Sequence, residues 1–88
     1  MKIKDGFILR DVGDKTFVVA TGELSKSFNG MIHLNETGKL IWELLSKETT
    51  EEDIVKGIME KYTDAPIDLV RSDVRTFIEK IKADGVLE

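Results

Sequence analysis

The sequence of 88 residues contains no cysteine, one proline and one histidine. Without cysteine, the chain has neither disulfides nor thiolate metal ligands, and a lone histidine leaves little material for a metal cluster. No run of 18 apolar residues is present, so we expect no membrane span. The first residues include no apolar segment of the kind that forms a secretory signal, and we therefore expect a cytoplasmic protein.

What the chain does contain is an ordinary globular mixture, with 41% hydrophobic residues, 34% charged residues and a net charge of −4. Its length predicts a single domain over residues 1–88. A domain this short buries only about 60% of the surface of its unfolded chain, which leaves little core to surround a deep catalytic cavity. The composition therefore favours a surface-binding role over catalysis.

The first third of the chain is predicted to form short strands. Apolar runs rich in β-branched and aromatic residues cover Phe7–Val12 and Thr16–Ala20. Gly13-Asp14 lies between them and supplies the positive-φ positions of a two-residue hairpin turn. Asn29-Gly30 is a second turn signal, and Met31–Leu34 is predicted as a third strand. Period-two alternation places the isoleucine and leucine of this strand on its core face.

Beyond Asn35, a good N-cap, the apolar residues recur at helical spacing. The first predicted helix covers Glu36 to Ser46. The second begins at the capping box Thr50-Glu51-Glu52-Asp53 and ends near Thr63. The third starts between Pro66 and Leu69 and ends near Asp84. In the first helix we place Trp42 to the side of the apolar stripe. Strands followed by helices predict an α+β domain, winged helix-turn-helix-like, in which a three-stranded antiparallel sheet precedes three helices.

Residues suited to catalysis are scarce. His33 lies in a predicted strand with no cysteine partner, and the sequence has neither a Gly-x-Ser-x-Gly motif nor a glycine-rich phosphate loop. The carboxylates Glu51, Glu52 and Asp53 stand at a helix start, where they stabilise the positive end of the helix dipole. We therefore expect a protein that is not an enzyme and that uses no cofactor or metal.

Charge argues against nucleic-acid binding, the obvious role for a helix-turn-helix shape. The 34 residues before Asn35 have a net charge of +1, whereas the residues after it have 8 Lys and Arg against 13 Asp and Glu, a net charge of −5. Binding through counterion release needs clustered cations on the surface that faces the phosphates. A winged-helix DNA-binding transcriptional regulator remains the alternative, and a structural subunit without a ligand is a third hypothesis.

Peptide binding fits the sequence better. The strand Met31, Ile32, His33, Leu34 precedes a helix and can lie at a sheet edge, where its backbone would bind an extended peptide by strand addition. Specificity would come from a face of the third helix, formed by Arg71, Val74, Arg75 and Ile78. The two arginines stand one turn apart, and a partner carboxylate would relieve their repulsion. Alternatively, nearby acidic residues already offset them and the face is only solvated. An open edge also allows a strand-swapped dimer.

Three segments together resemble a known family. They are Met31-Ile32-His33-Leu34-Asn35-Glu36-Thr37-Gly38 with Ile41-Trp42 and Leu44-Leu45, then Thr50-Glu51-Glu52-Asp53-Ile54, and then Asp73-Val74-Arg75-Thr76-Phe77-Ile78 with Asp84-Gly85-Val86-Leu87. The family is PqqD, the small proteins of pyrroloquinoline quinone biosynthesis, whose domain is also called the precursor peptide recognition element of ribosomally synthesised, post-translationally modified peptides (RiPPs). The resemblance extends from about Lys4 to Leu87, and Leu34 to Gly38 is its most specific part.

This resemblance implies a non-catalytic adaptor. Such domains bind the leader segment of a precursor peptide beside the third strand, against the third helix, and present it to a modifying enzyme, often a radical S-adenosylmethionine enzyme. By position, the strand is Met31 to Leu34 and the helix face is that of Arg71, Val74, Arg75 and Ile78. We interpret Asn35 to Gly38 as residues that hold the fold and do not contact the ligand.

Overall fold

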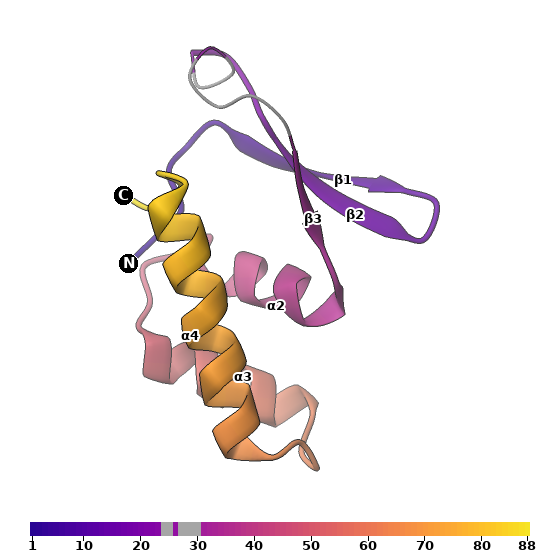
Figure 1. Ribbon diagram of the computed structural model, residues 1–88, viewed down its shortest axis with the longest axis vertical. Helices are drawn as coiled ribbons and strands as arrows, with labels where there is room; N and C mark the ends of the chain where they lie inside the picture. The colour runs from indigo at the N-terminus through magenta and orange to yellow at the C-terminus, as the bar shows by residue number, and fades with distance from the viewer. Residues whose placement is uncertain (24–25, 27–30) are drawn as a thin grey trace.

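A small twisted sheet lies across one end of a group of helices in a computed structural model that describes residues 1–23, 26 and 31–88 (Figure 1). Its strands and helices are β1 (Phe7–Val12), β2 (Lys15–Ala20), β3 (Met31–Leu34), α2 (Glu36–Leu44), α3 (Glu51–Lys61) and α4 (Ile67–Ala83). The antiparallel strands are in the order β1-β2-β3. The predicted α+β architecture, a sheet followed by helices, is therefore confirmed.

The β1–β2 hairpin forms where the apolar runs and the turn signal predicted it. Val12 pairs with Lys15, so Gly13 and Asp14 are the two loop residues. Gly13 has a φ of 65°, which only glycine adopts without strain. Asp14 keeps a negative φ, contrary to the prediction that both turn positions would be positive. One glycine at the first position is enough for such a turn. The turn predicted at Asn29-Gly30 lies outside the described residues.

Side-chain caps fix the starts of two helices. The Asn35 Oδ1 atom accepts a hydrogen bond from the Gly38 backbone N–H at 2.7 Å, and the Thr50 Oγ1 atom accepts one from the Asp53 N–H at 3.1 Å. Each cap satisfies a backbone donor that the helix itself leaves without a partner. Both predicted starts are confirmed, whereas α2 and α3 each end two residues before their predicted ends.

The core lies between the sheet and the helices, and Trp42 belongs to it. This side chain is 5% exposed, and its ring meets Phe7 edge-on with 5.9 Å between centroids. The prediction that Trp42 stands beside the apolar stripe was wrong because the sheet covers α2 on a second side. The other buried apolar residues are Ile3, Val18, Ile32, Leu34, Ile41, Leu45, Ile54, Val55, Ile58, Val70, Val74, Ile81 and Val86.

The two chain termini meet beside the C-terminal end of α4 (Figure 1). Gly85, at a φ of 77°, ends this 17-residue helix and turns the chain so that Val86 is fully buried. Ile3 and Leu87 form an antiparallel bridge, and the Lys4 N–H donates to the Val86 carbonyl at 2.9 Å. No helix in the described part of the chain has the length and apolar character needed to cross a membrane.

Candidate functional site

β3 is an edge strand. Within residues 1–23, 26 and 31–88, it pairs with β2 on one side and with no segment on the other. The sheet order thus leaves one flank of Met31–Leu34 available for an additional strand. The edge position predicted for this strand is what the topology shows.

The register identifies which backbone groups of β3 face outward. The Thr21 N–H donates to the Gly6 carbonyl at 2.6 Å, so this pair is hydrogen-bonded across β1 and β2. Hydrogen-bonded pairs alternate along antiparallel strands, and therefore the odd-numbered residues of β2 bond to β1 and the even-numbered ones to β3. Val18 pairs with Ile32, and Thr16 with Leu34. It follows that the N–H and C=O groups of the two remaining residues of β3 point away from the sheet.

Those two residues are Met31 and His33, and their side chains are also exposed, Met31 to 61%. Ile32 and Leu34 instead bury their side chains, as the alternation predicted, at 7% and 3% exposure. The four residues therefore divide into two functions. Ile32 and Leu34 anchor the strand to the core and to β2, while Met31 and His33 offer four backbone groups at the free edge.

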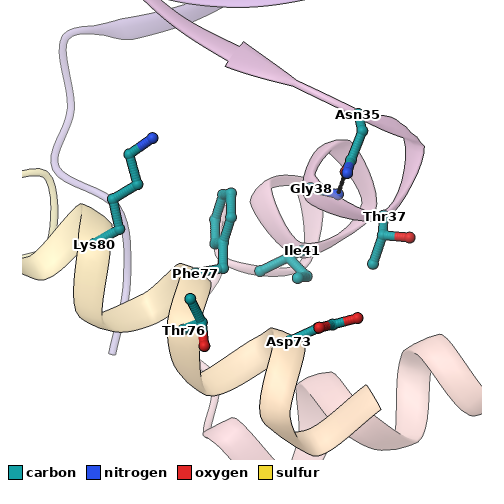
Figure 2. Close-up of a pocket in the computed structure, with 8 residues that line it drawn as sticks. All are labelled: Asn35, Thr37, Gly38, Ile41, Asp73, Thr76, Phe77 and Lys80. Carbon is teal, nitrogen blue, oxygen red and sulfur yellow. Dashed lines mark hydrogen bonds between the residues drawn. The ribbon is translucent and has the colours of Figure 1, made fainter. Parts of the chain in front are cut away.

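A pocket of about 340 Å³ lies between the start of α2 and the middle of α4, next to the end of β3 (Figure 2). Phe77 and Ile41 form its apolar part, and the Phe77 and Lys80 side chains point from α4 toward β3. The remaining lining residues are Asn35, Thr37, Gly38, Asp73 and Thr76. An apolar floor bordered by polar groups is the usual construction of a site that holds one side chain of a ligand.

Gly38 lets the start of α2 lie close to Phe77 of α4. A Cβ atom at this position would lie 3.4 Å from the Phe77 Cε2 atom and 3.2 Å from the Asn35 Oδ1 atom, which already caps the helix. Asn35, Thr37 and Gly38 also line the pocket, a position that the interpretation of this segment as purely structural did not include.

The helix face predicted for peptide contact does not line this pocket. Arg71 donates two hydrogen bonds to the Glu52 carboxylate, at 2.5 and 2.7 Å, and Arg75 donates one to Glu51 at 3.3 Å. Both arginines thus face α3 and already have carboxylate partners. Val74 is fully buried in the core, and Ile78 is half-buried against it. None of these four residues is among those that line the pocket beside β3, and their contact with a peptide stays a prediction.

The α4 residues that do line the pocket are Asp73, Thr76, Phe77 and Lys80. Spacings of three, four and seven residues place them along one face of a helix, so a pattern existed in the sequence. Phe77, however, also fits the apolar core stripe. Its side chain is half-buried, since it packs against the core and also lines the pocket. Nothing in the sequence shows which face of α4 turns toward β3.

The Glu52–Arg71 pair gives the α3–α4 contact a dependence on pH. The hydrogen bonds from Arg71 hold the pKa of the Glu52 carboxyl below its ordinary value of 4.5. A lowered pKa stabilises the fold above the ordinary value, and this contribution is lost as the pH falls through the lowered one. We expect Glu52→Gln to lower the urea midpoint at pH 7 and to have a progressively smaller effect as the pH falls below 4.5 and through the lowered pKa. Glu60→Gln, an exposed α3 control, should show no such change, and an effect of Glu52→Gln that stays the same as the pH falls would contradict the assignment.

The comparison with protein-family models matches residues 11–87 to coenzyme PQQ synthesis protein D (PqqD). The chain belongs to the PqqD family. The match includes β2, β3, all of α2, α3 and α4, and every residue of the pocket. No curated protein matches the chain.

A solved structure extends this result from the sequence to the fold. TbiB1 in complex with the TbiA(beta) leader peptide is similar to this PqqD-family chain, with a TM-score of 0.76 and 25% sequence identity. The alignment covers 100% of this chain and 95% of that one. The arrangement of a sheet followed by helices is therefore shared with a protein whose structure was solved in complex with a leader peptide.

Proposed function

We propose that this chain binds the leader segment of a ribosomally synthesised precursor peptide and presents it to a modifying enzyme, in the cytoplasm and without catalysing the modification. The observation that carries the proposal is the free flank of β3 next to the Phe77 pocket. Family membership and the likeness to a leader-peptide complex support it. DNA binding, the alternative from the sequence, has no support in either comparison.

Backbone pairing alone does not account for useful affinity. Met31 and His33 offer four hydrogen-bonding groups, and each net bond contributes about 0.5–1.5 kcal/mol, or roughly 2–6 kcal/mol together. Association of two molecules costs an estimated 4–15 kcal/mol in lost freedom of motion. The leader must therefore add side-chain contacts, and we assign an apolar side chain of the leader to the pocket floored by Phe77 and Ile41.

Truncation of the pocket floor tests this assignment. We expect Phe77→Ala to weaken leader binding by roughly two- to tenfold, because an aromatic contact is worth about 0.5–1.5 kcal/mol beyond its buried area. Met59→Ala is a matched control, since Met59 is also half-buried against the core but lies on α3. Calorimetric titration with the leader measures both. Equal losses in the two variants would show that Phe77 acts only through stability.

Titration of the labelled domain with the leader of the precursor encoded beside it tests the function itself. Amide shifts should concentrate at Met31, His33, Phe77 and Lys80. Shifts centred on Arg71 and Arg75 would instead place the peptide on the face predicted from the sequence. Salt-sensitive DNA affinity without any response to the leader would replace the proposal with the transcriptional regulator.

A further inference from the structure

The face of the sheet that points away from the helices is apolar. Among the described residues, five large apolar side chains are exposed, and three of them are on this face: Ile8 at 38%, Val12 at 64% and Met31 at 61%. Strand alternation places Phe17 and Val19 on the same face, since Phe17 pairs with His33 and Val19 with Met31. The Phe17 and His33 rings stand 5.4 Å apart between centroids. Exposed apolar area of this kind marks an interaction surface more often than it serves the monomer.

The charges on this face are all positive. Arg10 and Lys15 have the same orientation as the exposed apolar residues, because they alternate with the core-facing positions of β1 and β2. The only carboxylate within the three described strands, Asp11, lies on the opposite face. There it accepts a hydrogen bond from Thr16 Oγ1 at 2.7 Å and lies 3.7 Å from the Lys39 Nζ atom of α2. A chain with a net charge of −4 thus presents a cationic apolar surface on the outer face of its sheet.

A leader bound at β3 would enlarge this surface. Side chains of an added strand alternate between the two faces of the sheet, so every second leader residue would lie beside Met31 and His33 on the outer face. The outer face and the bound leader would then form one continuous surface. A protein that docks on it contacts both at once and distinguishes the loaded domain from the free one.

We propose that the outer face, defined by Ile8, Arg10, Val12, Lys15 and Phe17, docks the modifying enzyme through an acidic, apolar patch on that enzyme, with preference for the leader-loaded domain. The inference rests on the proposed function and adds the surface and the chemistry of the second partner. Charge complementarity of this kind gives specificity and speeds association.

The same charges disfavour the other occupants. A second copy packed face to face would place one cationic face against another, because a two-fold interface uses the same patch on both sides. Anionic membranes recruit clusters of roughly four to eight cations, whereas this face has two. An acidic protein surface with apolar residues complements both the positive charges and the exposed apolar side chains of the outer face.

The test uses the double reversal Arg10→Glu with Lys15→Glu, and the precursor leader and modifying enzyme encoded beside this chain. Lys47→Glu with Lys56→Glu changes the net charge equally on the helical side and is the control. We expect the loaded wild-type domain to bind the enzyme about tenfold more tightly than the free one, and the Arg10 and Lys15 reversal to weaken enzyme binding by about tenfold more than the control does. Leader affinity should stay within about twofold in both variants, because β3 separates Lys15 of β2 from an added leader strand, and both β2 and β3 separate Arg10 of β1 from it.

The outcomes separate the two proposals. Absence of leader binding by the wild type would overturn the proposed function. Normal leader binding with enzyme affinity equal in the reversal and the control would overturn the docking inference alone. Loss of binding to phosphatidylcholine–phosphatidylglycerol vesicles, with enzyme affinity retained, would assign the face to a membrane and overturn it as well. Ile8→Thr with Val12→Thr, which leaves every charge in place, should reproduce the loss of enzyme binding.

Discussion

Replacement of His33 by proline is expected to lower leader affinity about 10- to 100-fold while the domain remains folded. Proline removes the outward N–H of His33, and its ring occupies the space where the carbonyl of an incoming strand would approach. The fold tolerates the change because this N–H does not bond to β2, and proline is accepted at edge positions of that kind. Calorimetric titration with the leader, beside a circular-dichroism melt of the variant, provides the measurement.

His33→Ala separates the backbone from the side chain. Alanine also removes the imidazole and its contact with the Phe17 ring, but it keeps the N–H. We expect this variant to bind the leader within about threefold of the wild type, since the net bond to the N–H remains. Equal affinities of His33→Pro and His33→Ala would show that the β3 edge is not where the leader adds. Proline at Ile32 is not an equivalent test, because that N–H faces β2.

Trp42→Ala is expected to destabilise the domain by about 3–5 kcal/mol, the usual cost of removing a large buried aromatic side chain. Trp42 is 5% exposed and joins α2 to the sheet through Phe7. For 88 residues, a typical total stability is roughly 4–13 kcal/mol. The variant should therefore lose much of its stability and unfold at a far lower urea concentration.

Trp42→Phe is the control for this substitution, since it retains an aromatic ring that can still meet Phe7. We expect its urea midpoint to lie between those of the wild type and Trp42→Ala. A loss below 1 kcal/mol in Trp42→Ala would contradict the burial that the structure assigns to this side chain. Val12→Ala, at an exposed position, should shift the midpoint only slightly.

Local signals predicted the elements because local physics determines them. Gly13 sets the hairpin, while Asn35 and Thr50 start two helices with their own side-chain oxygens. Alternation was sufficient to place Ile32 and Leu34 in the core, because a strand has only two faces. The edge position of β3 also followed from a short strand that leads directly into a helix.

The face of α4 that lines the pocket could not be predicted in the same way. A helix has several faces, and the sequence of α4 does not indicate which other helix or strand packs against each face. Arg71 and Arg75 were assigned to the peptide because they repel each other within α4, but their partners Glu52 and Glu51 stand 19 and 24 residues earlier on another helix. Tertiary ion pairs at such separations leave no periodic pattern. The position of Phe77 in the pocket could not be predicted either, because the spacing of an aromatic residue in the apolar stripe of a helix predicts a core position.

The bridge between Ile3 and Leu87 has a consequence for how the domain can be joined to other proteins. Residues paired across two antiparallel strands have Cα atoms only about 4.5–5.5 Å apart. Splicing the whole domain into a surface loop of a host protein would therefore open that loop by little more than the width of one strand pair. Native ends could also be sealed by a short linker and new ones cut at the exposed Gly13-Asp14 turn, giving a circular permutant with the same hydrogen-bonded interior.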